Sequence, residues 1–140
     1  VRNVDRLQRK WETAKQYVHA PEFYQESNTS TQGIVFFGTS GYAALEAMEL
    51  LEEQGNDLDV MRIRSLPFND DVKQFFEDHK QVFVIEQNRD AQFRSLLMNE
   101  LGISPNKLIP VLNYDGMPIT ADAILNKIKS HLPEPQNIEY

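Results

Sequence analysis

Cysteine is absent from this chain of 140 residues. Without a thiol the chain can form no disulfide, cannot ligate an iron–sulfur cluster and has no cysteine nucleophile, so any redox centre must lie outside it. Positive charge is also in short supply, because 14 Lys and Arg residues face 21 Asp and Glu residues and leave a formal charge of −7. This balance argues against a nucleic-acid partner, whose phosphates are neutralised by Lys and Arg.

Long apolar runs are missing as well. No stretch approaches the roughly 20 apolar residues that cross a bilayer, and no secretory signal is present, which predicts a soluble, cytoplasmic protein without a membrane partner. The sequence begins at Val1 with no initiator Met, which suggests a piece of a longer protein. None of His19, His79 and His131 has the spacing of a metal ligand, so we expect surface or rim histidines.

The N-terminal segment, residues 1–18, is predicted to form a linker helix. Its apolar residues recur every three or four positions, and its other faces are basic. The stripe consists of Val4, Leu7, Trp11, Ala14 and Val18. Two interpretations remain open, a solvated basic face or a helix that docks on a neighbouring domain with Trp11 as its anchor.

The rest of the chain predicts one α/β domain. Residues 19–33 read as a connection with a possible edge strand at Phe23 and Tyr24. Apolar runs then alternate with helical stripes, which predicts parallel strands joined by right-handed crossovers. The predicted strands cover residues 34–37, 58–66, 82–85 and 108–112. We therefore expect a three-layer α/β/α sandwich over 34–132, with a mostly parallel sheet of four to five strands and a poorly packed tail at 133–140.

Three positions give helix boundaries. Asn69 and Thr120 have the side chains of N-cap residues, and Asn69 is followed by two acidic residues that suit a helix N-terminus. Gly102 stands just past a helical stripe, where a left-handed residue ends many helices. These signals place helices after the second, third and fourth predicted strands.

Polar stretches are expected to gather at the carboxyl ends of the strands, where parallel sheets bind ligands and partners. One such stretch is Gly38-Thr39-Ser40-Gly41. Glycines and hydroxyls suit a phosphate cradle, but the Walker lysine and the full dinucleotide fingerprint are absent. Helix capping by Thr39 or Ser40 is the simpler interpretation, and anion binding is the alternative.

Two arginines lie near this edge. Arg62 and Arg64 are two positions apart in a predicted strand, so their side chains project from the same face. Paired guanidinium groups suit a phosphate or carboxylate ligand. Pairing with nearby acidic residues explains them equally well.

The polar stretch EQNRDAQF at 86–93 follows the third predicted strand directly. Asn88 or Asp90 can cap the next helix. One cap residue suffices, which leaves a surplus of Glu86, Gln87, Arg89 and Gln92 that favours an interface or a binding site.

Three motifs in order carry a resemblance to a known family: MRIRSLPFNDDV at 61–72, IEQNRDAQ at 85–92 and KLIPVLNYDGMPITADAI at 107–124. The chain resembles the C-terminal domain of the alpha subunit of 2-oxoacid:ferredoxin (acceptor) oxidoreductases, in the branch that fuses gamma and alpha regions. The resemblance implies a transketolase C-terminal-like fold with a mixed five-stranded sheet, in which the fifth strand is an antiparallel edge strand near Phe23. It also implies that Glu86, Gln87, Asn88 and Gln92 form the strand-end motif, and that Arg62 and Arg64 belong to the fused branch.

The family decarboxylates a 2-oxoacid with thiamine diphosphate and Mg²⁺, passes electrons through iron–sulfur clusters to ferredoxin and forms an acyl-CoA. This chain lacks both the GDG motif for the diphosphate and any cysteine, so the resemblance implies a domain that supports catalysis without performing it. Its expected partners are the thiamine-binding beta subunit and neighbouring domains, and ferredoxin indirectly. Coenzyme A binding through Arg62, Arg64 and the loop at 38–41 is the alternative, and a free-standing flavodoxin-like domain is a further one.

Overall fold

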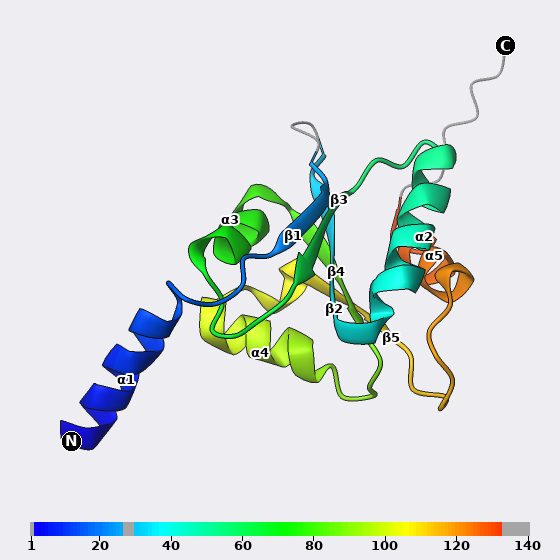
Figure 1. Ribbon diagram of the computed structural model, residues 1–140. Coiled ribbons are helices and arrows are strands. Elements are labelled where there is room, and N and C mark those ends of the chain that lie inside the picture. The colour runs from blue at the N-terminus through cyan, green and yellow to red at the C-terminus, as the bar shows by residue number, and fades with distance from the viewer. Residues whose placement is uncertain (1, 27–29, 133–140) are drawn as a thin grey trace, which may run out of the picture.

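The computed structural model describes residues 2–26 and 30–132, so the predicted tail at 133–140 lies outside the described residues. The chain begins with an isolated helix and two consecutive strands, after which helices and strands alternate (Figure 1). The strands are β1 (Glu22–Gln25), β2 (Gln32–Phe37), β3 (Asp59–Ile63), β4 (Gln81–Glu86) and β5 (Leu108–Leu112). The helices are α1 (Arg2–Ala14), α2 (Gly41–Glu53), α3 (Asp70–Asp78), α4 (Gln92–Leu101) and α5 (Ala121–Lys129), with short 3₁₀ turns at Gly38–Ser40 and Pro105–Lys107.

The five strands form one sheet in the order β1-β3-β2-β4-β5. β2, β3, β4 and β5 pair in parallel, whereas β1 pairs with β3 in the antiparallel sense. Both the mostly parallel sheet and the antiparallel edge strand near Phe23 are therefore confirmed. The described part of the chain is an α/β fold of the predicted class.

Helices cover both faces of the sheet, which explains why the central strands are almost wholly apolar. Successive residues of β2 point to opposite faces, so Ile34 and Phe36 pack against α2 and α5 while Val35 packs against α3 and α4. Figure 1 shows α2 and α5 together on one side of the sheet and α3 and α4 on the other. The three-layer prediction is confirmed.

The helix boundaries follow the predicted signals. The Asn69 side chain accepts a hydrogen bond from Val72 N, and that of Thr120 accepts one from Ala123 N. Gly102 ends α4 with a φ of 67°, in the left-handed region where glycine carries no Cβ penalty. All three predicted boundaries are confirmed.

β3 ends earlier than predicted, at Ile63 instead of residue 66. Ile63 pairs with Phe37, the last residue of β2, and the chain turns at Gly38 immediately afterwards. Arg64 consequently has no neighbour in β2 with which to extend the ladder. The pairing register between β2 and β3 sets this boundary. That register cannot be derived from the sequence of β3 alone.

The N-terminal helix α1 is shorter than the predicted 1–18 segment and ends at Ala14. None of its residues is buried, and it points away from the sandwich (Figure 1). Within residues 2–26 and 30–132, no helix combines the length and apolar character that a bilayer span requires.

Candidate functional site

The carboxyl ends of the parallel strands bring four loops together, as the fold class predicts. We call this side of the sheet the carboxyl edge. Its loops follow β2, β3, β4 and β5 and cover residues 38–40, 64–69, 87–91 and 113–120. The predicted polar stretches therefore share one edge, and their contacts show what each side chain does there.

Glu86, the last residue of β4, is completely buried. Its carboxylate accepts hydrogen bonds from Phe93 N at 2.6 Å, from Arg94 N at 2.9 Å and from the Asn88 side chain at 2.8 Å. The carboxylate thus takes the place at the α4 N-terminus that a bound anion would otherwise occupy. All three of these hydrogen bonds are made inside the domain.

The predicted cap of α4 by Asn88 or Asp90 is wrong in its details. The residue before the helix is Ala91, with a left-handed φ of 49°, and it has no capping side chain. Asn88 Oδ1 instead accepts from Asp90 N and Gln92 N, which shapes the turn that leads into the helix. The cap comes from Glu86 because a buried strand end can reach the first amides of the next helix.

Gln87 connects three loops of the carboxyl edge. Its amide group donates to Thr39 Oγ1 at 3.3 Å and to Ser40 Oγ at 3.1 Å, and its carbonyl oxygen accepts from Ile119 N at 3.2 Å. The hydroxyls of Thr39 and Ser40 are therefore acceptors for Gln87. Neither caps a helix, because α2 has no side-chain cap, so that prediction is wrong.

Arg62 and Arg64 both approach one carboxylate, that of Glu22 on β1. The N–O distances are 3.5 Å for Arg62 and 3.2 Å for Arg64. The Tyr24 hydroxyl, which donates to Glu22 at 2.7 Å, is the largest cause that lowers the pKa of Glu22, and the two arginines lower it further. The interpretation of the arginines as partners of nearby acidic residues is confirmed.

The remaining polar residues of the stretch at 86–93 face solvent. Arg89 forms an ion pair with Asp90 at 2.7 Å, and the hydrogen bond that it donates to the Asp90 carboxylate is the main reason that the pKa of Arg89 is raised. Gln92 lies at the wall of a cavity of about 530 Å³ that opens between β2, β3 and α4. The cavity is lined mainly by apolar groups with Arg64 and Asn88 among them, whereas Arg62, Thr39, Ser40 and Gly41 do not line it. The lining also includes Phe37, Gly38, Ile63, Ser65, Leu66, Phe93 and Leu96.

Large apolar side chains are exposed along the carboxyl edge. Phe37 ends β2, Tyr42 stands in the first turn of α2, Leu66 follows β3, and Tyr114 and Met117 follow β5. Their exposed fractions run from 38% for Phe37 to 92% for Tyr42. Apolar side chains gathered at one side of a protein are typical of a surface that meets a partner.

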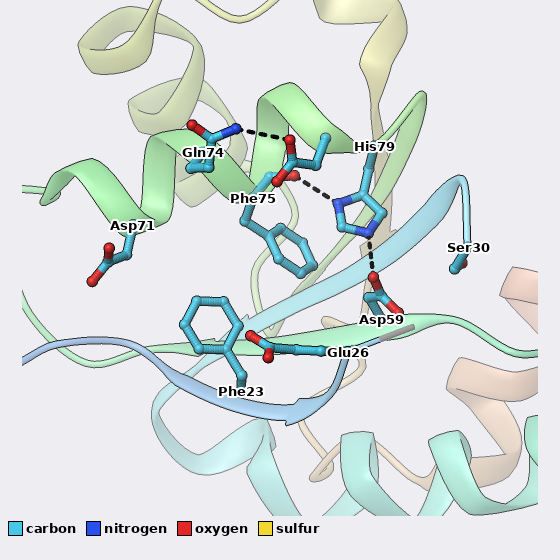
Figure 2. Close-up of a pocket in the computed structure, with 9 residues that line it drawn as sticks. Phe23, Glu26, Ser30, Asp59, Asp71, Gln74, Phe75 and His79 are labelled. Atoms are coloured by element: carbon cyan, nitrogen blue, oxygen red, sulfur yellow. Dashed lines mark hydrogen bonds and ion pairs between the residues drawn. The ribbon is translucent and has the colours of Figure 1, made fainter. Parts of the chain in front are cut away.

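A second polar group lies at the opposite, amino edge of the sheet and was not predicted. His79, between α3 and β4, is 4% exposed, which corrects its prediction as a surface histidine, while His19 and His131 are exposed as expected. Its Nε2 lies 2.9 Å from Asp59 Oδ2, and its Nδ1 lies 2.6 Å from the carbonyl oxygen of Phe75 (Figure 2). A carbonyl oxygen only accepts, so Nδ1 carries a proton. A hydrogen bond between two buried side chains joins Nε2 and the Asp59 carboxyl group.

The sequence contained a signal for the burial of His79. Val72, Phe75 and Phe76 form the buried stripe of α3, and His79 continues it at the seventh position after Val72. Asp59 likewise opens the buried strand β3. His79 and Asp59 each lie beside buried apolar residues in the sequence. This position favours a polar side chain that is buried and hydrogen-bonded over one on the surface.

The described residues contain no group of three or more His, Asp or Glu side chains that could hold a metal ion. The carboxyl group of Glu86 contacts amides, that of Asp59 contacts His79, and that of Glu22 contacts Arg62, Arg64 and Tyr24. The geometry of the carboxyl edge therefore suits contact with a partner or a ligand that approaches its apolar groups.

Comparisons with known proteins agree on the fold. Neither the protein-family models nor the curated protein sequences give a significant match. Among solved structures, 2-oxoglutarate:ferredoxin oxidoreductase from Magnetococcus marinus, with 2-oxoglutarate, coenzyme A and succinyl-CoA bound, is 24% identical with a TM-score of 0.74. That match covers 85% of this chain and 21% of the other. A split gene transketolase, an inactive beta4 tetramer, is 20% identical with a TM-score of 0.63, and the match covers 79% of this chain and 40% of that one.

A third similar structure is the alpha chain of a probable 2-oxoacid ferredoxin oxidoreductase from Thermoplasma acidophilum. It is 25% identical with a TM-score of 0.52, and the match covers 79% of this chain and 95% of the other. The chain therefore has a transketolase C-terminal-like fold and is structurally similar to alpha chains of 2-oxoacid:ferredoxin oxidoreductases. It spans about a fifth of the length of the Magnetococcus protein.

Proposed function

We propose that this chain is the C-terminal domain of the alpha subunit of a thiamine-diphosphate-dependent 2-oxoacid:ferredoxin oxidoreductase, in the branch that fuses gamma and alpha regions. Its role is to hold domains and subunits together, including the thiamine-binding beta subunit, while the decarboxylation of the 2-oxoacid to acyl-CoA takes place elsewhere. The similarity to two oxidoreductase structures and the three ordered motifs support this proposal. The division into a linker helix at 1–18, a connection at 19–33, a domain at 34–132 and a tail at 133–140 stays a prediction.

The exposed apolar residues of the carboxyl edge are the observation on which the assembly role depends. Five large apolar side chains stand at or just after the carboxyl ends of β2, β3 and β5 or in the first turn of α2. Burying such side chains against a partner releases about 25 cal/mol for each Å² of apolar surface. Glu86 and Gln87, by contrast, contribute by fixing the loops that present these side chains.

Chemistry by this domain itself has little support from its residues. Thiamine diphosphate and Mg²⁺ need the diphosphate motif that the sequence lacks, and iron–sulfur clusters need cysteine. These cofactors are therefore assigned to other parts of the proposed enzyme. The polar groups of this edge, Glu86 above all, bind backbone amides and so hold the fold.

The assembly role can be tested in the complete enzyme that contains this domain. Tyr42→Ser, Tyr114→Ser and Met117→Ser together should weaken the association of subunits, measured by sedimentation velocity, because each removes exposed apolar surface. Glu53→Ser, at the exposed C-terminal end of α2 and away from this edge, should leave assembly unchanged. Unchanged assembly of the triple variant would contradict the proposal.

A decarboxylation assay of the chain alone tests whether this domain is non-catalytic. The chain alone should not release CO₂ from any 2-oxoacid, with or without added thiamine diphosphate, Mg²⁺ and coenzyme A. Coenzyme A-dependent decarboxylation by this chain alone would refute it.

A second candidate function is coenzyme A binding at the carboxyl edge. The cavity of about 530 Å³ favours it, because aromatic walls from Phe37 and Phe93 stand beside the cation of Arg64. Pockets of roughly 300–1,000 Å³ with a few polar groups are typical small-molecule sites. Of the residues predicted to receive the phosphates, the cavity wall includes Gly38 and Arg64.

Calorimetric titration of coenzyme A into the chain separates this candidate from the assembly role. Saturable binding that Arg64→Ala weakens and Arg89→Ala leaves unchanged would support it, since both residues are exposed arginines of the same edge and Arg89 lies outside the cavity wall. Absence of saturable heat would remove it for this chain.

A further inference from the structure

The cavity of about 530 Å³ at the carboxyl edge differs in charge from the chain around it. The chain carries a formal charge of −7, yet the described residues that line the cavity include Arg64 and neither Asp nor Glu. The other polar side chains of the wall, those of Ser65, Asn88 and Gln92, are neutral. A ligand that enters this cavity therefore meets one positive charge and no negative charge in the described wall.

The rest of the wall is apolar and comes from β2, from the end of β3 with the loop after it, and from α4. Its large side chains are Phe37, Ile63, Leu66, Phe93 and Leu96. The rings of Phe37 and Phe93 pack at a centroid distance of 4.3 Å, and Phe37 is still 38% exposed. The wall thus offers apolar surface that an apolar group of a ligand can cover.

Arg64 can hold a ligand because its contact with Glu22 uses only part of its guanidinium group. A guanidinium has five N–H donors in a planar fork. Nη1 of Arg64 lies 3.2 Å from Oε1 of Glu22, and the Arg64 side chain remains 39% exposed. Donors therefore remain for a carboxylate in the cavity, an anion whose two oxygens match the fork.

Glu22 has contacts that do not involve Arg64. Its second oxygen, Oε2, accepts from the Tyr24 hydroxyl at 2.7 Å and from Arg62 Nη1 at 3.5 Å. An exposed ion pair such as that of Arg64 with Glu22 contributes little to stability. A ligand carboxylate can therefore replace Glu22 on Arg64 while Glu22 keeps its other contacts.

The charge of the wall limits the class of ligand. A second anionic group on the ligand would find no cationic side chain in the described wall, and a charge that leaves water without a partner is unfavourable. A ligand without any charge would leave Arg64 unused. The cavity therefore suits a ligand that joins one carboxylate to an apolar body.

We propose that this cavity binds an organic monocarboxylate, with its apolar body against Phe37 and Phe93 and its carboxylate on Arg64, and that Glu22 competes with the ligand for Arg64. The bound ligand leaves Glu22 to its contacts on β1 and β3. The inference rests neither on the assembly role nor on coenzyme A binding, because this ligand needs neither a second subunit nor a site for phosphate groups.

Octanoate is a suitable probe, because it joins one carboxylate to an aliphatic chain. When octanoate is titrated into the protein, the amide NMR resonances of Gly38, Ser65 and Leu96 should shift saturably, whereas that of Ala47 on the other face of the sheet should not. Octanol, which has the aliphatic chain without the charge, and acetate, which has the charge without the chain, should each bind at least about tenfold more weakly. The octylammonium ion should not bind, because the cation of the wall repels it.

Two pairs of variants test the charges. Arg64→Ala should weaken octanoate binding at least about tenfold, because it removes a charge-assisted hydrogen bond. Arg89→Ala removes the same charge from the same edge but outside the wall and should have no effect. Glu22→Gln should strengthen binding about threefold, because it removes the competitor for Arg64. Glu49→Gln makes the same change in charge on the exposed side of α2 and should have no effect. Circular dichroism identifies any variant that fails to fold.

Three results would overturn the proposal. The first is an octanoate titration without a saturable shift. The second is equal affinity for octanol and octanoate, or equal affinity of Arg64→Ala and the native chain for octanoate, because the cation then has no role. The third is a folded Glu22→Gln variant that binds octanoate no better than the native chain, which would exclude the competition. The assembly role is measured on side chains outside this cavity wall, so either proposal can fail while the other stands.

Discussion

Each edge of the sheet buries one carboxylate, and the two carboxylates are held in different ways. At the carboxyl edge, Glu86 is held by two backbone N–H groups and one amide side chain. At the amino edge, Asp59 is held by the imidazole of His79. The first arrangement secures the start of a helix, and the second joins a strand start to a helix end through a side-chain hydrogen bond.

The comparison shows what a polar residue next to a buried strand does most readily. A carboxylate that leaves water needs hydrogen-bond donors, and the nearest donors are the free amides of a helix N-terminus or a protonated side chain. Both edges satisfy this need with groups of the same domain. Surplus polarity at a strand end is therefore used first for folding, and exposed apolar residues are the better sign of a partner.

The largest expected effect comes from removing the carboxylate of Glu86. Glu86→Ala leaves Phe93 N, Arg94 N and the Asn88 amide without their acceptor, which should lower the free energy of unfolding by about 4 kcal/mol. Urea denaturation followed by circular dichroism measures the change. Glu86→Gln retains one acceptor oxygen and should cost about half as much. Equal stability of Glu86→Ala and the native chain would show that these amides find other acceptors.

His79→Leu tests the other edge and should cost about 3 kcal/mol. The substitution removes the donor to Asp59 and leaves a buried carboxylate without its imidazole. The same urea experiment measures it. In a double-mutant cycle with Asp59→Asn, we expect a coupling energy on the order of 1–2 kcal/mol, because each single change already breaks the same pair. Strictly additive effects would mean that the two side chains act independently.

The residues of the two edges also differ in how well the sequence predicts their positions and contacts. Strand alternation placed the residues around Glu86 and Gln87 at the carboxyl edge correctly, because the rule depends only on the order of elements along the chain. The detailed contacts depend on distances between elements, such as that from Glu86 to the first amides of α4, which a sequence does not contain. His79 was predicted as a surface residue, although its position on the stripe of Val72 and Phe75 indicates burial.

A smaller effect is expected at Gln87, which joins the loops of the carboxyl edge. Gln87→Ala should cost about 1 kcal/mol, because the exposed side chain loses neutral hydrogen bonds that water can replace. Hydrogen exchange at Ile119 N should accelerate, since its acceptor is the Gln87 carbonyl oxygen. Exchange at Ala123 N, whose acceptor is the Thr120 side chain that caps α5, provides the control and should not change.

The smallest effect concerns Glu22, the exposed carboxylate that Tyr24, Arg64 and Arg62 hold. Its pKa is lower in the folded chain, so it stabilises the fold above the pH at which an unfolded glutamate titrates, about 4.3, and this stabilisation is lost as the pH falls through the folded value. Glu22→Gln removes the dependence. Between pH 6 and pH 3 the native chain should therefore lose slightly more stability in urea than the variant does. Tyr24→Phe removes the largest cause of the lowered pKa and should fall between them, whereas Tyr17→Phe should match the native chain. A variant that loses more stability than the native chain would reverse the sign and show that Glu22 is not stabilised as a carboxylate.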